Sequence, residues 1–480
     1  MNNINKVLEI SIALSSEKDY KKILTKIVDE SMNITNCDAA TLYLKQDDKL
    51  YFYISRNKTL DIFQGDGSQS INLPPVMINE DSVSGYVAYK KESINTHDIY
   101  NDPKFHFEGP KKYDSMTGYH TKSMLVIPLI NREEEVLGVL QLINSMDKDG
   151  NIIAFDNNIQ DIIYALASLS AISLSNKLLY EEIEQLLDSF IKAMVTAIDS
   201  RTPYNANHTI NVARLCDEFV NYLNNNGYSI SVNDKDELVM AAMCHDIGKI
   251  ITPLNVLNKA TRLEGKIDLM KMRFKVIESE LKCKYLNNEI DLNTYNEEYK
   301  LFKEYTDFVI SLDTKGYITP NELDYIKKIY EKEYETSFGI LKIIEENEIL
   351  DASIVKGTLT SDERKEIEMH VVYTNRILND IRFGKKYQNV KKIASSHHEY
   401  LDGSGYPNHI KDDVISTLIR IITICDVYES LTSTDRPYKK PMPKEIACKI
   451  LGEMVNEGKL DNTLVLMFKK YVGENIWKRK

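Results

Sequence analysis

The sequence has few cysteines for its length, and none is placed to act with another. Its 480 residues contain six cysteines and no CxxC pair. A disulfide framework and a thiolate zinc ribbon both need closely spaced cysteines, so this distribution excludes both. We expect the cysteines to be small buried residues.

The chain also lacks an excess of basic residues and any low-complexity tract. Its 72 acidic residues outnumber 60 basic ones, which leaves a net charge of −12. Nucleic-acid polymers are therefore excluded as expected partners, because their binding needs a positive surface. Small phosphorylated ligands are compatible with this charge, since local cations or metal ions can oppose it. With 43% hydrophobic residues and about 100–200 residues per domain, the chain should fold as two or three domains.

A leader and an obvious membrane span are missing as well. Residues 1–14 lack the basic stretch, apolar core and small-residue cleavage site of a signal peptide. No window approaches the roughly 18 uninterrupted apolar residues of a membrane span. We therefore expect a cytoplasmic protein with no membrane partner.

Residues 1–155 mix helical and β-like patterns. The clearest strand pair is Ser123–Ile130 and Val136–Ile143, separated by a polar turn. This pattern predicts an α+β domain with an antiparallel sheet. Residues 156–200 follow as one connecting helix, because proline and glycine are absent from residue 157 to about residue 200.

The connecting helix carries an apolar seam with two interpretations. Leu179, Ile183, Leu186 and Phe190 recur at spacings of four, three and four, and Asn176 could extend the same seam. The helix either packs against its own domains or forms a parallel dimer stalk that carries a signal. The spacing alone does not choose between them.

After residue 200 the strand signals nearly vanish, which predicts an all-α region over residues 201–460 and a C-terminal helix or tail over residues 461–480. A lysine- and glutamate-rich stretch, about 259–356, interrupts the patterns on either side. We expect this stretch to be an inserted helical subdomain.

Histidines and aspartates in apolar segments form the chemical signal of this region. Five of the nine histidines belong to it, and His245-Asp246 stands in the sequence AMCHDIGK. An adjacent imidazole and carboxylate can serve two metal ions, because a carboxylate has two oxygens and can bridge. Asp426 ends the apolar run IITICD, where a buried carboxylate is costly unless it is compensated.

Two explanations of this cluster are open from the residues alone. Each histidine could simply cap or pack a separate helix. Alternatively, the side chains converge on a metal site, as clustered histidines and aspartates on buried helices commonly do. Ligands without a thiolate favour Fe, Mn or another ion that accepts five or six ligands.

The motifs resemble those of the HD-GYP family, a branch of the HD phosphohydrolases that degrades cyclic di-GMP. His245-Asp246 with Lys249 is similar to its first signature, and residues 397–407, HHEYLDGSGYP, are similar to its second. The N-terminal region, especially Asp81–Ala88 and Val136–Asn144, is similar to GAF domains. The resemblance implies a GAF domain joined by a long helix to an all-α HD-GYP domain.

The resemblance also implies a site with two divalent metal ions, Fe or Mn. It assigns His208, His245, Asp246 and Asp426 to one ion and His370, His397 and His398 to the other, with Asp246 bridging. Asp246 and Lys249 are the implied catalytic residues. Substrate contacts are implied for Lys249, Tyr406, Arg436 and Lys439. Glu399 and Asp402 are expected to orient ligands.

The expected reaction is hydrolysis of cyclic di-GMP to pGpG, with GMP as the product of a second cut. Two metal ions about 3.5–4 Å apart would activate a water as hydroxide. The alternatives are another cyclic dinucleotide such as 3′,3′-cGAMP, the nucleotide (p)ppGpp, and a receptor that binds the dinucleotide without cleaving it. We also expect a homodimer and control by a GAF ligand that the sequence does not identify.

A third metal ion is not expected. Some family members bind it through a glutamate four residues before the first metal histidine, and this chain has Tyr204 there. A neutral phenol cannot supply the missing negative charge. Asp199 is expected to be poorly placed as a substitute, because it lies nine residues before His208 and across Pro203.

Overall fold

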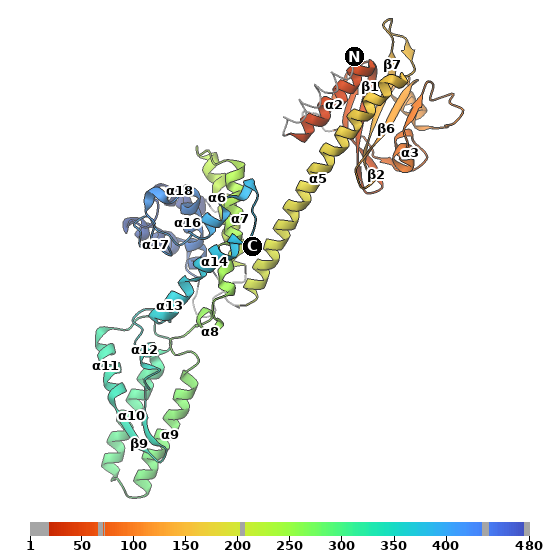
Figure 1. The fold of residues 1–480 in the computed structure, drawn as a ribbon. Helices are drawn as coiled ribbons and strands as arrows, with labels where there is room; N and C mark the ends of the chain where they lie inside the picture. The colour runs from red at the N-terminus through yellow and green to blue at the C-terminus, as the bar shows by residue number, and fades with distance from the viewer. Residues whose placement is uncertain (1–18, 66–70, 72, 202–206, 434–440, 475–480) are drawn as a thin grey trace. The chain divides into compact units, whose positions relative to one another are not determined.

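The structure is a computed structural model that describes residues 19–65, 71, 73–201, 207–433 and 441–474. It divides into two compact units, residues 1–187 and 188–480. Helix α5 (Asn157–Asp199) begins in the first unit and ends in the second, and Figure 1 shows the order of the elements. The single helix predicted from residue 157 to about residue 200 is confirmed.

The first unit contains an antiparallel sheet. Its strands follow the order β3-β2-β1-β7-β6-β5, with β4 paired to β2 and β8 paired to β7. Strand β6 pairs antiparallel with β7, which confirms the predicted hairpin. The strands are β1 (Cys37–Gln46), β2 (Lys49–Asn57), β3 (Ile62–Gln64), β4 (Val76–Met77), β5 (Ile94–Thr96), β6 (Met124–Ile130), β7 (Val136–Met146) and β8 (Ile152–Ile153).

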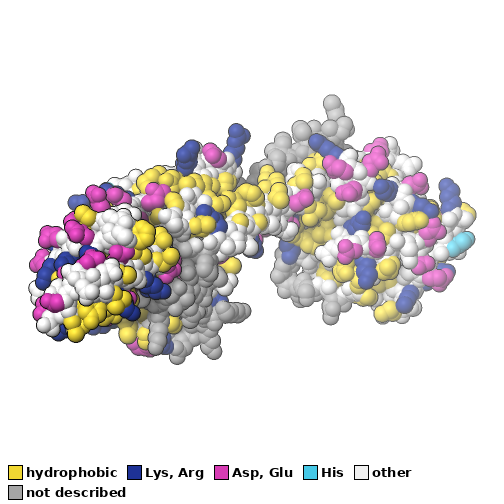
Figure 2. Space-filling view, turned by 90° about the horizontal axis from the view of Figure 1, so that it is seen from below, with side chains coloured by type: hydrophobic (Ala, Val, Ile, Leu, Met, Phe, Trp, Pro, Cys, Tyr) yellow, Lys and Arg dark blue, Asp and Glu magenta, His cyan; other side chains and the backbone are white. Residues whose placement is uncertain are grey.

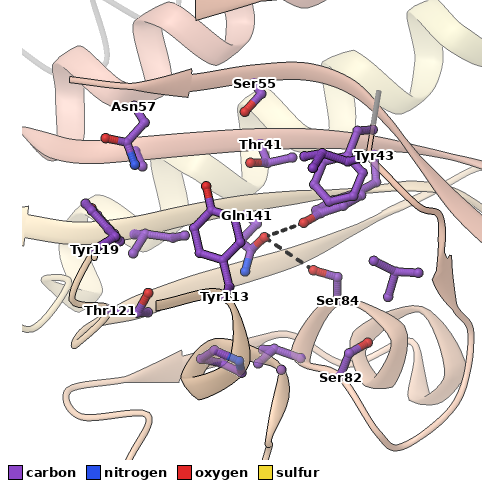
Figure 3. Close-up of a pocket in the computed structure, with 18 of the residues that line it drawn as sticks. Thr41, Tyr43, Ser55, Asn57, Ser82, Ser84, Tyr113, Tyr119, Thr121 and Gln141 are labelled. Atoms are coloured by element: carbon purple, nitrogen blue, oxygen red, sulfur yellow. Dashed lines mark hydrogen bonds between the residues drawn. The ribbon is translucent and has the colours of Figure 1, made fainter. Parts of the chain in front are cut away.

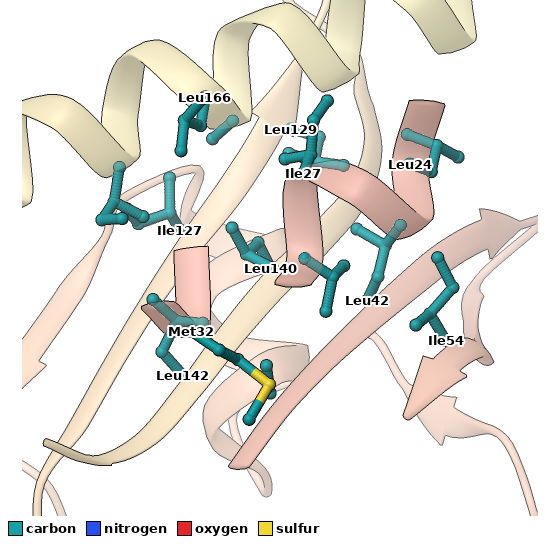
Figure 4. Close-up of a cluster of buried hydrophobic side chains, with 14 of the residues drawn as sticks. Leu24, Ile27, Met32, Leu42, Ile54, Ile127, Leu129, Leu140, Leu142 and Leu166 are labelled. Carbon is teal, nitrogen blue, oxygen red and sulfur yellow. The ribbon is translucent and has the colours of Figure 1, made fainter. Parts of the chain in front are cut away.

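Helices cover both faces of this sheet, because successive side chains of a strand point to opposite faces. Leu125 and Ile127 of β6 belong to a core shared with α2 (Tyr20–Thr35) and α5, shown in Figure 4. Met124 and Val126 belong to the opposite core, together with residues of α3 (Val83–Lys90). Helix α4 (Gly109–Thr117) follows β5 in the chain. The predicted α+β domain is therefore present.

Helix α5 is long and apolar enough, by length and composition alone, to cross a membrane. One third of its most apolar window is buried inside the protein. Ile163, Leu166 and Ala167 of this helix pack in the core beside the sheet. Side chains that cover the sheet cannot face lipid, so we interpret this part of α5 as a core helix.

The second unit is mainly helical, as predicted. Its core includes Phe219 and Phe468, whose ring centroids are 5.0 Å apart. Outside the predicted insertion, the elements are α6 (His208–Asn225), α7 (Val232–Cys244), η1 (Ile247–Ile250), α8 (Leu254–Leu257), α13 (Ser361–Glu368), α14 (His370–Asn379), η2 (Lys385–Tyr387), α15 (Val390–Ala394), η3 (Asp412–Val414), α16 (Thr417–Thr432), α17 (Lys444–Asn456) and α18 (Asn462–Gly473).

Residues between α8 and α13 bury a hydrophobic cluster of their own. The prediction that this region is purely helical is wrong, because it also contains a β-hairpin. Tyr334, which the sequence placed at the end of a helix, pairs with Leu341 across the hairpin. Gly339, with φ of +106°, supplies the left-handed residue beside its turn. The elements are α9 (Ile267–Leu286), α10 (Leu292–Leu312), α11 (Pro320–Glu331), β9 (Glu333–Thr336), β10 (Gly339–Lys342) and α12 (Ile349–Ala352).

Candidate metal centre

The His245–Asp246 pair lies at the end of α7 and not inside a helix. Helix α7 ends at Cys244, and Asp246 precedes the 3-10 turn η1. Consecutive residues of a continuous helix point about 100° apart. The turn lets both buried side chains approach one point: Asp246 Oδ2 lies 3.3 Å from His245 Nε2.

The turn η1 packs directly on α14, which begins with His370. A Cβ atom at Gly248 would lie 1.9 Å from the carbonyl oxygen of His370, so the close approach requires glycine. Thr374 Oγ accepts a hydrogen bond from Gly248 N at 3.0 Å and donates one to the His245 carbonyl at 2.9 Å. The glycine of the first signature thus brings His370 beside the His245–Asp246 turn.

Three further elements bring the remaining predicted ligands. The His397–His398 pair follows α15, Asp426 lies in α16, and His208 begins α6. His208 Nε2 lies 3.2 Å from Asp426 Oδ1 and 3.6 Å from Asp246 Oδ2. All seven predicted metal ligands therefore belong to one cluster.

Three buried imidazoles share one hydrogen-bonding pattern. Nδ1 of His245, His370 and His397 lies 2.7, 2.6 and 2.7 Å from a backbone carbonyl oxygen. Nδ1 must carry the hydrogen to donate these bonds, so Nε2 keeps its lone pair. All three Nε2 atoms are buried without a hydrogen-bond partner. Burying an unpaired acceptor is costly, and coordination of a metal ion would offset this cost.

Burial keeps these histidines neutral. It is the largest cause of the low pKa of His370, about 3, and of His398, about 4. Burial also holds the pKa of His397 well below its ordinary value. A buried charge loses its hydration, which disfavours the protonated ring. Neutral imidazole is the form that binds metal ions.

Both carboxylates of the cluster are ionised. Burial would raise the pKa of Asp246, but the charges of His245 and Lys249 outweigh it and hold the pKa well below normal. The pKa of Asp426 is also lowered, because its hydrogen bond to His208 outweighs burial. Each carboxylate therefore offers anionic oxygens to a cation.

The ligand atoms form two groups, and within each group they lie within 4.8 Å of one another. Asp246 faces both groups: Oδ2 approaches His245, and Oδ1 lies 3.4 Å from His370 Nε2. This geometry fits a bridging carboxylate, and the nitrogen and oxygen donors fit divalent Fe or Mn. The groups are His208, His245 and Asp246, and His370, His397 and His398.

Glu429 completes the cluster, and the sequence analysis did not identify it. Its buried carboxylate accepts from His208 Nδ1 at 2.6 Å and from the Asn211 amide at 3.1 Å. Burial lowers the pKa of His208, but hydrogen bonds to Asp426 and Glu429 outweigh it and raise the pKa to about 10. A carboxylate behind a ligand histidine fixes the orientation and tautomer of the ring. Its position three residues after Asp426 was the available sequence signal.

The predicted substrate contacts are placed in part. Lys249 Nζ lies 2.5 Å from Asp246 Oδ2, so its charge is held at the cluster. The Tyr406 ring lies beside His398, with centroids 4.7 Å apart. Arg436 and Lys439 lie outside the described residues.

Glu399 and Asp402 act on the loop that contains Tyr406, not on the ligands. The buried Glu399 carboxylate accepts from the backbone N–H groups of Asn408 and Ile410, at 2.7 and 3.1 Å. Asp402 accepts from Ser404 N at 2.9 Å. The expectation that these carboxylates orient metal ligands is wrong, because backbone donors of the loop occupy them.

Asp199 is closer to the cluster than its sequence position indicated. Arg201 Nη1 donates to the Lys249 carbonyl at 2.9 Å, which places the end of α5 beside η1. Burial, and secondly the charge of Asp246, raise the pKa of Asp199 to about 6. The expectation that this carboxyl is poorly placed rested on chain separation, which the fold of α5 against η1 overcomes.

Comparison with known families and proteins assigns both parts of the chain. Residues 19–174 match the GAF domain family, and residues 205–301 and 344–464 each match an HD domain family. Among solved structures, the GAF domain of an Acinetobacter phosphoenolpyruvate-protein phosphotransferase is 13% identical, with a TM-score of 0.30, over 38% of this chain and 98% of that chain.

Two curated relatives match within the chain. A 3′3′-cGAMP-specific phosphodiesterase of Vibrio cholerae is 37% identical over 107 residues, 22% of each protein. A cyclic di-GMP phosphodiesterase of Pseudomonas aeruginosa is 35% identical over 136 residues, 28% of this chain and 32% of that protein. The chain thus spans about a fifth to a third of the length of these relatives. From the family matches and the fold, the chain carries an N-terminal GAF domain joined by the long helix α5 to a helical HD domain.

Proposed function

We propose that this protein is a metal-dependent phosphodiesterase that hydrolyses cyclic di-GMP to pGpG, with GMP as the product of a second cut. The observation that carries the proposal is the convergence of five histidines and two aspartates, with three imidazole Nε2 atoms buried and unpaired. Two relatives with phosphodiesterase names support the class of reaction. The HHEYLDGSGYP segment, similar to the HD-GYP signature, supports the choice of a cyclic dinucleotide.

The residues of the cluster have distinct proposed roles. When bound, two divalent ions would supply an acidified water and neutralise phosphate oxygens. Asp246, Asp426 and the five histidines hold the ions. Lys249 places a positive charge beside Asp246, where it can bind the scissile phosphate in a partly dry site. Tyr406 and the basic residues Arg436 and Lys439 contact the substrate.

A second substrate is favoured by one specific observation. The relative with 37% identity carries the name of a 3′3′-cGAMP-specific enzyme. Both dinucleotides present the same phosphodiester to the metal site, so selectivity depends on base recognition elsewhere. A receptor without catalysis is the remaining alternative.

One experiment separates these functions. Metal-loaded protein is incubated with cyclic di-GMP and, in parallel, with 3′,3′-cGAMP, and the products are resolved by chromatography. Conversion of cyclic di-GMP to pGpG supports the proposal, and faster conversion of 3′,3′-cGAMP assigns the second substrate. Binding of a dinucleotide without any product would establish a receptor.

We expect two metal ions per chain. The two ligand groups account for two ions, and Tyr204 replaces the carboxylate that a third ion requires. Protein purified with excess iron or manganese should therefore saturate near two ions per chain in elemental analysis. A reproducible value of three would contradict this expectation and point to Asp199 as the added ligand.

We further propose that the protein is a parallel homodimer through α5, which couples the GAF domain to the metal site. Leu179, Ile183, Leu186 and Phe190 are all more than half exposed. Hydrophobic side chains along this helix are visible at the surface in Figure 2. Their spacing places Ile183 and Phe190 at a positions of a heptad, and Asn176 occupies an earlier a position. A polar residue at an a position favours a defined register.

The dimer is tested by charging the seam. Ile183→Glu combined with Leu186→Glu should yield a monomer in light scattering, because four carboxylates would be buried in the interface of the dimer. Leu178→Glu is the matched control, since Leu178 is exposed but lies off the seam. A monomeric wild-type chain, or a double variant that stays dimeric, would contradict the proposal.

A further inference from the structure

The GAF domain contains a cavity of about 370 Å³ bounded by strands of the sheet and by α3 and α4. Polar and aromatic side chains line it, as Figure 3 shows. Its volume lies near the lower end of the roughly 300–1,000 Å³ typical of small-molecule sites. The cavity therefore has room for a molecule of one or two rings.

Gln141 is the polar group that most needs a partner in this cavity. It stands in the apolar strand β7 and is only 8% exposed. Its Oε1 accepts from the Tyr43 hydroxyl at 2.9 Å and from the Ser84 hydroxyl at 3.4 Å. The amide nitrogen has no hydrogen-bond partner among the described residues, and Figure 3 places the amide among the lining side chains. Two buried N–H donors without acceptors are costly, and a carbonyl oxygen of a ligand would satisfy them.

The charges around the cavity argue against an ionic ligand. None of the described lining residues is acidic, so a cation would find no counter-ion. The Arg56 guanidinium is engaged elsewhere: it donates to Asp29 Oδ1 at 3.1 Å and to the Gln64 carbonyl at 2.7 Å. Lys112 is exposed, where water solvates its charge. A phosphate inside the cavity would therefore lose hydration without gaining a desolvated cation.

The shape of the lining favours a flat molecule. Tyr43, Phe52, Tyr113 and Tyr119 contribute aromatic rings, and the first two are 4.7 Å apart at their centroids. Aromatic walls pack best against planar rings. We propose that this cavity binds an uncharged planar heterocycle whose ring carbonyl accepts hydrogen bonds from the Gln141 amide. The site is separate from the metal centre and does not depend on its proposed activity.

Calorimetric titration of the full-length protein tests the ligand class with three probes. Hypoxanthine is a neutral two-ring heterocycle with a ring carbonyl, purine has the same rings without the carbonyl, and inosine monophosphate adds a charged phosphate. We expect hypoxanthine to bind at least about tenfold more tightly than purine, because purine leaves the amide unpaired. Inosine monophosphate should not bind. Absence of binding by hypoxanthine, or tighter binding of the phosphate, would overturn the proposal.

Variants of the lining residues test the position of the ligand. Gln141→Glu replaces the donor amide with acceptor oxygens and should weaken hypoxanthine binding at least about tenfold. Lys112→Met is the control and should leave its affinity unchanged. Thermal unfolding checks that each variant is folded, and Gln141→Leu replaces Gln141→Glu if the charge prevents folding. Wild-type affinity in a folded Gln141 variant would overturn the assignment.

Discussion

Asp246→Ala should lower the rate of cyclic dinucleotide hydrolysis by about 10³-fold or more and should reduce bound metal at the same time. The two oxygens of Asp246 approach His245 Nε2 at 3.3 Å and His370 Nε2 at 3.4 Å, so the side chain serves both ligand groups. Its removal would also leave repulsion between two cations uncompensated. Product chromatography measures the rate, and elemental analysis measures the metal.

Two comparisons make this result specific. Asp413→Ala removes an exposed carboxylate of the same domain and should change neither quantity. Lys249→Ala should keep most of the metal and lose rate, because the lysine contributes charge beside the cluster and is not a ligand. Full activity in a metal-replete Asp246→Ala protein would refute the assignment of the site.

Glu429→Ala should weaken metal binding by about 10- to 100-fold, the usual effect of removing a carboxylate that orients a ligand histidine. Without Glu429, the Nδ1–H group of His208 loses the acceptor 2.6 Å away and the ring loses its fixed orientation. Competition with a chelator of known affinity measures the change. Because Glu429 is a positioning residue, saturating metal should restore most of the activity.

Glu429→Gln separates orientation from charge. The amide oxygen can still accept from His208, so this variant should bind metal more tightly than Glu429→Ala but less tightly than the wild type. Glu457→Gln, at an exposed position, is the matched control. Unchanged metal affinity in a folded Glu429→Ala protein would show that His208 does not depend on this contact.

Local patterns in the sequence predicted the elements that local physics decides. Alternating apolar residues predicted the β6–β7 hairpin, and a stretch without proline or glycine predicted α5. The short hairpin β9–β10 was missed, because four-residue strands carry too little alternation to stand out from neighbouring helices. The predicted metal ligands could be identified because they stand in compact motifs whose residue types already limit their chemistry.

The sequence by itself determined the order of a sheet domain, a long helix and a helical domain, together with the residue types available for a metal site. Only the tertiary structure decided which groups meet. Glu429 and His208 are 221 residues apart, and Asp199 approaches the cluster because the residue after the next contacts η1. The free amide of Gln141 depends on hydroxyls from a different strand and a helix. Contacts of this kind arise when packing closes the chain on itself, so no local spacing of residues reports them.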